Sequence, residues 1–280
     1  MTNFYQKLIP YGLIVVGIFT AAPFVWADSF TINSGDTVTT TQTLDVDGET
    51  GLIESGGFLD LTAGTSKAII IDSDLTTSVS ITNNGTITAQ RDAIDDGGTN
   101  TGVIVTIINN GTISTTADSA DSDAINFTGT TASTLILTNN GTIETFATSI
   151  GAEAIVMGGD NNIVINNGTI VTQGTTADAI TTSCQNCTIT NNGTIITKGT
   201  NAHGIFYLNP AGAQESLTIT NTGSIITKGT TSNGILLNNE ADVIVNNSGL
   251  IHAFDSTAVS YTHLRAHETD SYLVCRLLLE

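Results

Sequence analysis

Two acidic segments of the sequence carry side chains that could do chemistry. They are RDAIDD, with Asp92, Asp95 and Asp96, and DSADSDAI, with Asp118, Asp121 and Asp123. Paired carboxylates can act as general acid and general base in glycan cleavage, and carboxylate oxygens are also calcium ligands. Arg91 is the only basic residue beside these segments, and the aromatic residues that a sugar groove would use are sparse, at 5% of the chain. We therefore favour solvated acidic loops over a catalytic centre.

A column of acidic residues is expected where equivalent positions of a sequence repeat come together. Each member precedes an apolar pair of the Ala-Ile type in four successive copies, with Lys67 before them and His203 after them: Asp92, Asp123, Glu153 and Asp178. Like charges stacked about 5 Å apart would cost ~1 kcal/mol per neighbour in water. A weakly bound calcium ion would relieve this repulsion, whereas separately solvated carboxylates would cap turns. The four residues are weak candidates for a metal site, and turn capping is the favoured interpretation.

Other nucleophiles and metal ligands are few. A serine nucleophile needs a base, and His203 and His252 are the only candidates in a sequence without a G-x-S-x-G motif. Cys184 and Cys187, in SCQNC, do not sit at a helix N-terminus, because Cys187 falls on a strand position of the repeat. A small-loop disulfide or two buried thiols is therefore favoured over redox catalysis or metal binding. The sequence predicts no catalytic residue, no cofactor and no enzymatic activity.

The elements that must position these residues follow from a repeat of about 25 to 30 residues. Each copy contains a variant of ITNNGTIT, and the copies are anchored on eight glycines: Gly57, Gly85, Gly111, Gly141, Gly168, Gly193, Gly223 and Gly249. Aliphatic residues recur four positions before and two positions after each anchor, which indicates one strand entering and a second strand leaving. A third apolar position follows a loop of variable length, as in Ala124-Ile125 and Ala154-Ile155. A period in this range is typical of a solenoid.

Asn-Gly turns occur in antiparallel hairpins, and they also suit the bends of a parallel coil. Like residues at equivalent positions favour the coil, because they stack about 4.8 Å apart in a parallel solenoid. We predict an all-β fold, a right-handed parallel β-helix of about nine rungs. Inward asparagines two positions before the anchors should form a ladder of amides: Asn83, Asn109, Asn139, Asn166, Asn191, Asn221 and Asn247. The residue after each of them is expected to adopt a positive φ at the bend.

Repetition is a requirement for stability in such a chain. One rung buries three or four aliphatic side chains, on the order of 5–10 kcal/mol gross. Ordering its roughly 27 residues costs at least as much. Each rung must therefore serve as the floor of the next. Eight copies and an irregular segment over 28–51 would give a rod roughly 40 Å long.

The N-N-G-T-I repeats over 28–258 resemble the passenger regions of bacterial autotransporters, which are right-handed parallel β-helices. The resemblance implies a non-enzymatic passenger, adhesive or structural, exposed at the outer membrane of a Gram-negative bacterium. It also implies a C-terminal β-barrel in the native protein. The residues do not specify the extracellular ligand or surface that would be the partner. The alternative is an extracellular carbohydrate-active β-helix of the polysaccharide lyase or hydrolase type.

Charge and the two ends of the sequence restrict the classes further. The formal net charge of −19 argues against nucleic acid, because too few cations are present to replace phosphate counterions. Residues 1–27, with an apolar run after Lys7 and VWA at the end, are predicted to be a secretory signal peptide. Residues 259–280 depart from the composition of the repeat and resemble the translation of a sequencing adapter. This tail is expected to be non-native and to leave the repeat pattern, with further rungs after residue 258 in the native chain.

Overall fold

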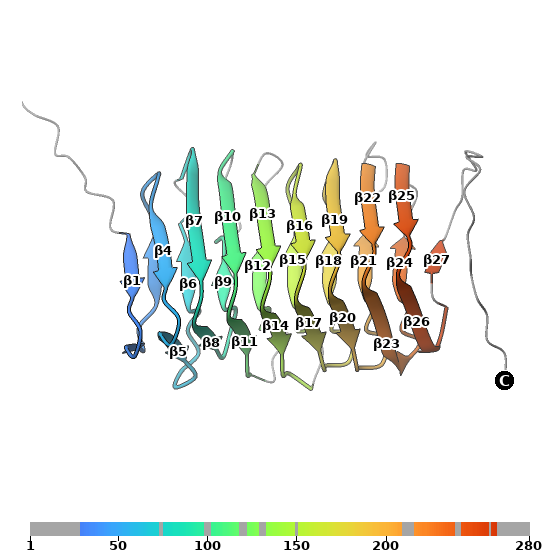
Figure 1. Cartoon of the computed structure of the whole chain (residues 1–280), viewed down its shortest axis with the longest axis horizontal. Helices are drawn as coiled ribbons and strands as arrows, with labels where there is room; N and C mark the ends of the chain where they lie inside the picture. The colour runs from blue at the N-terminus through green and yellow to red at the C-terminus, as the bar shows by residue number, and fades with distance from the viewer. Residues whose placement is uncertain are drawn as a thin grey trace, which may run out of the picture.

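Strands follow one another along the chain in groups of three. The computed structural model describes residues 29–72, 75–97, 102–117, 122–128, 133–148, 151–208, 216–238, 242–257 and 259–261. Within these ranges every strand pairing is parallel and no helix is present. Successive groups lie side by side along one axis, from β1 at one end to β27 at the other (Figure 1). The predicted all-β parallel solenoid is confirmed, and the hairpin alternative is excluded.

Three parallel sheets of nine strands each form the walls of the solenoid. The first contains β1 (Phe30–Ile32), β4 (Thr50–Ile53), β7 (Ser78–Asn83), β10 (Ile104–Asn109), β13 (Thr134–Asn139), β16 (Ile163–Asn166), β19 (Cys187–Asn191), β22 (Ser216–Asn221) and β25 (Asp242–Asn247). The second contains β2 (Thr37–Val38), β5 (Phe58–Leu61), β8 (Thr86–Ala89), β11 (Thr112–Thr115), β14 (Thr142–Thr145), β17 (Thr169–Thr172), β20 (Thr194–Thr197), β23 (Ser224–Thr230) and β26 (Leu250–Asp255). The third contains β3 (Gln42–Leu44), β6 (Ile69–Ile71), β9 (Ile94–Asp95), β12 (Ile125–Phe127), β15 (Ile155–Met157), β18 (Ile180–Thr182), β21 (Ile205–Leu208), β24 (Ile235–Asn238) and β27 (Val259–Tyr261).

Alternation along each strand builds the core. In β13, Leu135, Leu137 and Asn139 are buried and the residues between them are only partly buried. Leu137 pairs with Ile107 of β10 on one side and with Val164 of β16 on the other. The buried aliphatics of all turns form one continuous cluster along the axis. Each turn therefore covers the apolar side chains of its neighbour, as the repeat requires.

Close backbone stacking explains the anchor glycines. A Cβ built on Gly141 would overlap the carbonyl oxygen of Gly111 in the preceding turn. At this corner the N–H groups of Asn140 and Gly141 both donate to the carbonyl of Asn109, at 2.7 and 3.0 Å. None of the anchor glycines has a positive φ, and neither does any residue that follows a ladder asparagine. The predicted positive φ is therefore wrong, and glycine is needed for the close approach of the two backbones.

The first turns depart from the expected pattern in two ways. The segment over 28–51, expected to be irregular, forms β1, β2, β3 and the start of β4 within residues 29–51. Ile53 pairs with Asn83, not with Ile81, so the register of β4 is shifted by two residues from the alignment on glycines. Two extra residues in the corner before Gly57 account for the shift, because Leu59 still pairs with Ile87.

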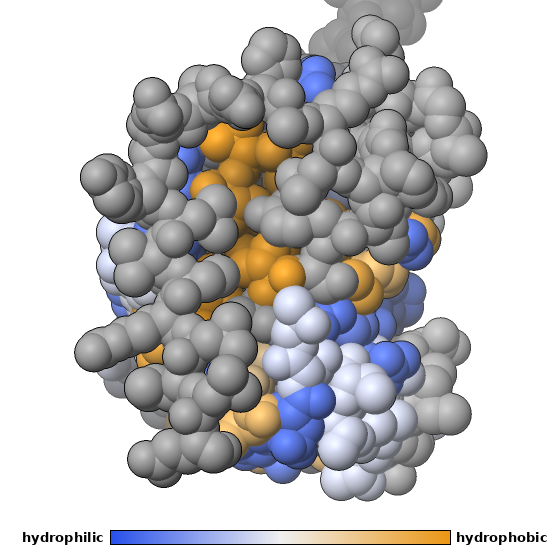
Figure 2. Space-filling view, turned by 90° about the vertical axis from the view of Figure 1, so that its right-hand side faces the viewer, coloured by the Kyte–Doolittle hydropathy of each residue, from blue (hydrophilic) through white to orange (hydrophobic). Residues whose placement is uncertain are grey.

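The last turn is more open than the others. Val243, Val245 and Ile251 are only half-buried there, although the equivalent Leu217, Ile219 and Ile225 are fully buried. Leu250 and Phe254 are exposed on the same turn. Figure 2 views this end and shows hydrophobic residues gathered on it.

The first residues of the predicted non-native tail, Val259–Tyr261, form a strand of the solenoid. β27 pairs with β24, and Val259 lies opposite Ile235. The expectation that the repeat pattern ends before Val259 is therefore wrong for Val259–Tyr261, because an apolar β-branched residue stands where the core position falls.

Some predictions concern residues outside the described ranges. The signal peptide (1–27), the rest of the tail (262–280), Asp118 and Asp121 all lie there. No helix in the described residues is long and apolar enough to cross a membrane.

Candidate functional site

A buried amide ladder runs along the corner between the first and second sheets. Each asparagine donates its side-chain N–H to the side-chain oxygen of the next, at 2.7 to 2.8 Å, from Asn83 to Asn247. Each Nδ2 from Asn83 to Asn221 also donates to a backbone carbonyl of the following turn. The ladder asparagines up to Asn221 are fully buried. Their polar groups are thus used by the stack itself.

A second ladder, which the sequence did not lead us to expect, runs beside it on the surface. Asn110 donates to Asn84, and Asn140 donates to Asn110, both at 2.8 Å. The same pattern continues to Thr222. The outer ladder donates toward the N-terminus, whereas the inner ladder donates toward the C-terminus. The repeated Asn-Asn pair therefore links successive turns in both directions.

Buried threonines form a third column that was missed in the sequence. They lie four positions after the anchor glycine, and each Oγ1 donates to a backbone carbonyl in the loop that follows, at 2.6 to 2.8 Å: Thr115, Thr145, Thr172, Thr197 and Thr227. The recurrence of threonine at this position was the available signal. Alternation alone would have placed an aliphatic residue there.

The predicted acidic column exists, and the carboxylates of Asp92, Asp123 and Asp178 cap the next turn. The side chain of Asp92 accepts from the backbone N–H of Asp123 at 3.0 Å, and that of Asp123 accepts from Glu153 at 2.8 Å. The side chain of Asp178 accepts from the N–H of His203 at 2.5 Å. His203 continues the pattern, since its Nδ1 accepts from the N–H of Asn233 at 2.9 Å. These groups satisfy backbone donors at successive corners.

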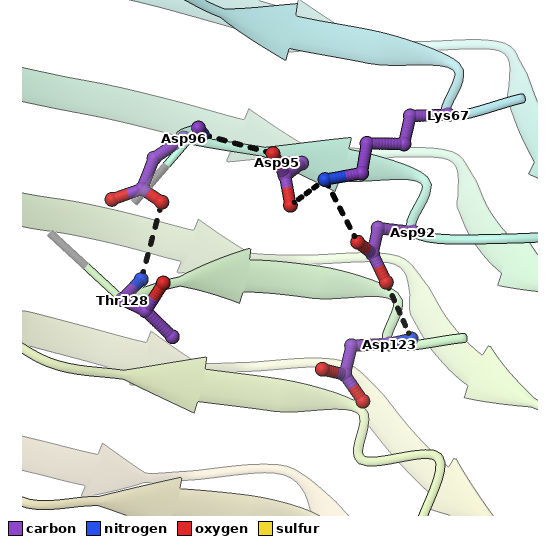
Figure 3. A network of polar contacts seen from close by, with 7 residues as sticks. Lys67, Asp92, Asp95, Asp96, Asp123 and Thr128 are labelled. Atoms are coloured by element: carbon purple, nitrogen blue, oxygen red, sulfur yellow. Dashed lines mark hydrogen bonds and ion pairs between the residues drawn. The ribbon is translucent and has the colours of Figure 1, made fainter. Parts of the chain in front are cut away.

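A lysine from the preceding turn neutralises the start of the column. Lys67 Nζ lies 2.6 Å from Asp95 Oδ2 and 3.4 Å from Asp92 Oδ2 (Figure 3). Asp96 points away from the lysine and accepts from the N–H of Thr128 at 3.2 Å. The RDAIDD segment is therefore a buried structural network with a cation from the preceding turn. The expectation of a solvated acidic loop is wrong for this segment, because its carboxylates are paired with Lys67 and with backbone N–H groups.

Burial dominates the electrostatics of the column. It raises the pKa of Asp92 to about 6, with the neighbouring Asp95 adding to the effect and Lys67 opposing it. Burial raises the pKa of Asp123 and of Glu153, and for Asp123 the charge of Glu153 raises it further. It raises the pKa of Asp178 to about 7, and it lowers the pKa of His203. The shifts favour the neutral forms of the imidazole and of these carboxyls.

A hollow of about 400 Å³ opens beside the C-terminal part of this column. Its lining comes from four successive turns: Glu153, Thr176, Asp178, Thr181, Asn201, His203, Phe206, Leu236 and Asn238. Thr181, Phe206 and Leu236 are register partners on the outer face of the third sheet. The column supplies the acidic wall of the hollow, and the sheet supplies its apolar floor.

The remaining candidates are dispersed. His252 lies on β26 of the second sheet and stacks on Phe254 at 4.4 Å, whereas His203 precedes β21 of the third sheet. Cys184 and Cys187 form a buried disulfide. Among the described residues, no group of three or more His, Cys, Asp or Glu side chains could hold a metal ion. The described residues thus form a lined hollow and a set of structural ladders.

No known protein family, curated protein or solved structure matches this chain. The fold places it in the class of parallel β-solenoids.

Proposed function

We propose that this chain is a secreted, surface-exposed passenger of an autotransporter-like protein, with an adhesive or structural role and no enzymatic activity. The observation that carries the proposal is that the buried asparagine and aspartate columns join one turn to the next. The buried threonine column holds the loop within each turn. What varies between copies is the loops and outer faces, where a display rod would carry its contacts.

Three further observations support an extracellular location. The chain begins with a segment that has the pattern of a signal peptide. Its net charge of −19 suits a solvated surface. Cys184 and Cys187 are joined by a disulfide, a bond that persists in oxidising compartments.

The proposal includes further solenoid turns and an outer-membrane barrel in the native protein. The half-buried Val245 and Ile251 of the last turn support it, because solenoid ends need a polar cap or another turn. Amplifying and sequencing the gene from its source DNA across the codon for Ala258 tests this part. Further N-N-G copies support it, and the same 22 residues followed by a stop codon would refute it.

Protease accessibility on intact cells tests the location. The gene is expressed in a Gram-negative host with an epitope tag in a surface loop of the solenoid, and protease is added to unbroken cells. We expect the tag to be lost while a periplasmic control protein survives. A tag that is cleaved only after the outer membrane is broken contradicts the proposal.

The second candidate is an extracellular carbohydrate-active enzyme. Glu153 and Asp178 line the same hollow, and the raised pKa of Asp178 suits a general acid. Against it, the two oxygens of Asp178 already accept from the His203 N–H and the Thr181 hydroxyl. Mass spectrometry of polysaccharides incubated with the protein distinguishes the two candidates: fragments support the enzyme, and intact polymers support the passenger.

A further inference from the structure

We infer that the hollow on the third sheet binds a single sugar residue of a non-acidic glycan. The inference rests on the proposed extracellular role and gives that role a ligand class. It starts from the lining of the hollow, in which polar groups and an apolar floor face one space of about 400 Å³. This volume lies within the usual range of small-ligand pockets, roughly 300–1,000 Å³.

His203 supplies a hydrogen-bond donor that the described part of the chain leaves unused. The residue is only 6% exposed, and it lines the hollow. Its Nδ1 accepts from the N–H of Asn233, so in the neutral ring the proton is on Nε2. Nε2 has no hydrogen-bond partner among the described residues. Burial lowers the pKa of the ring and so favours this neutral donor form.

The floor of the hollow is apolar. Phe206 and Leu236 are half-buried register partners on β21 and β24 and face outward from the third sheet. The Phe206 ring lies against His203, with ring centroids 5.7 Å apart. A pyranose has apolar C–H groups on its faces and hydroxyls on its rim. The Phe206 ring can pack against a face, and the Nε2–H of His203 can donate to a hydroxyl.

The rim carries short polar side chains that suit hydroxyl groups. Asn201 and Asn238 offer amides, Thr176 and Thr181 offer hydroxyls, and Glu153 offers a carboxylate. Thr176 and Asn201 hold positive φ values of 58° and 57°, an uncommon conformation for residues other than glycine. The amides and hydroxyls can donate to or accept from the hydroxyl groups of a sugar, and the carboxylate can accept from them.

Charge selects among sugars. Glu153 and Asp178 are the only ionisable wall residues besides His203, and none of the residues lining the hollow is a lysine or an arginine. A sugar with a carboxylate or sulfate would face carboxyl groups and no cation to offset its charge. The hollow therefore accepts neutral or amine-bearing sugars and rejects acidic ones.

Titration of the folded chain with defined oligosaccharides, followed by calorimetry, tests the inference. The three probe sets are neutral oligosaccharides, amine-bearing oligosaccharides and oligosaccharides of uronic acids. We expect saturable binding within the neutral or amine-bearing sets and none in the acidic set. Absence of binding to all three sets at millimolar concentration would overturn the inference, as would preferential binding of the acidic set.

Two variants locate the binding. F206L keeps an apolar side chain but removes the aromatic face, and we expect at least a tenfold loss of affinity. F254L changes an exposed aromatic residue on the second sheet and should leave the affinity unchanged. Thermal unfolding of both variants confirms that the fold is kept. Equal affinity of F206L and the parent chain would place the sugar elsewhere and refute the assignment. The protease test of surface display does not depend on this result, so the two proposals can fail separately.

Discussion

The side-chain N–H of Asn109 donates to the side-chain oxygen of Asn139 in the next turn of the solenoid, at 2.8 Å. Both residues are fully buried. Asn139 repeats the contact with Asn166 at the same distance. The Oδ1 of each ladder asparagine from Asn109 to Asn247 has this partner because the preceding turn carries the same residue. The ladder therefore ties the stability of each turn to the identity of its neighbours.

Replacing Asn139 by leucine should destabilise the chain by about 1–3 kcal/mol. The substitution leaves the Oδ1 of Asn166 and one donor contact of Asn109 without a partner in the core. Chemical denaturation measures the change in the free energy of unfolding. Asn140→Leu, one residue further on in the exposed ladder, is the control and should cost less than about 0.5 kcal/mol. Equal effects of the two substitutions would refute the role of the buried ladder.

Gly141→Ala should destabilise the chain by about 3 kcal/mol, the upper end of typical overpacking costs. The added methyl group would overlap the carbonyl oxygen of Gly111 in the preceding turn. Gly64→Ala is the matched control, since a Cβ there meets no atom within 4 Å. We expect the control to be neutral or slightly stabilising in thermal unfolding. A Gly141→Ala variant as stable as the parent would mean that the corner backbones are not stacked this closely.

Thr172→Val should cost about 1–3 kcal/mol although the two side chains have nearly the same shape. The Oγ1 of this buried threonine donates to the carbonyl of Ala177 at 2.6 Å, and valine leaves that bond unmade. Thr169→Val, on the outer side of the same strand, is expected to be nearly neutral. If Thr172→Val and Thr169→Val unfold at the same denaturant concentration, the threonine column does not contribute to stability.

Stability should fall as the pH rises from about 4 to 7. Burial raises the pKa of Asp178 from 3.8 to about 7, so the folded chain holds a proton that the unfolded chain has released. The resulting stabilisation is fully present below pH 3.8 and is lost as the pH passes through 7, at about 1.4 kcal/mol per pKa unit. Asp178→Asn keeps an oxygen to accept the His203 N–H, and it should flatten the profile. Unfolding curves across this pH range that coincide for the two chains would contradict the assignment.

Part of this architecture could be predicted from the sequence, because it depends on residues that recur at fixed offsets. An aliphatic residue recurs at the repeat position of Ile107, Leu137 and Val164. This recurrence predicts both the parallel pairing of the strands and the composition of the core. The inner asparagines stood out for the same reason. The register of Ile53 could not be predicted, since the extra residues of its corner are visible only once Leu59 and Ile87 are paired.

The candidate site was harder to foresee. The acidic column was visible in the sequence, but the direction of its carboxylates depends on backbone N–H groups that only the folded corners position. Lys67 joins Asp95 across a turn, a contact that follows from the loop lengths. Phe206 and Asn238 carry no motif, and they share a hollow with Glu153 because four successive turns are stacked in register there.

The central claim is that the acidic column holds the turns together and does not bind a metal. The most direct test is thermal unfolding of the chain in millimolar calcium and in chelator. Because Asp92, Asp123 and Asp178 already accept from backbone N–H groups of the next turn, we expect the same melting temperature in both conditions. A higher melting temperature in calcium, abolished by Asp123→Asn, would show that the column is a metal site and would contradict the account.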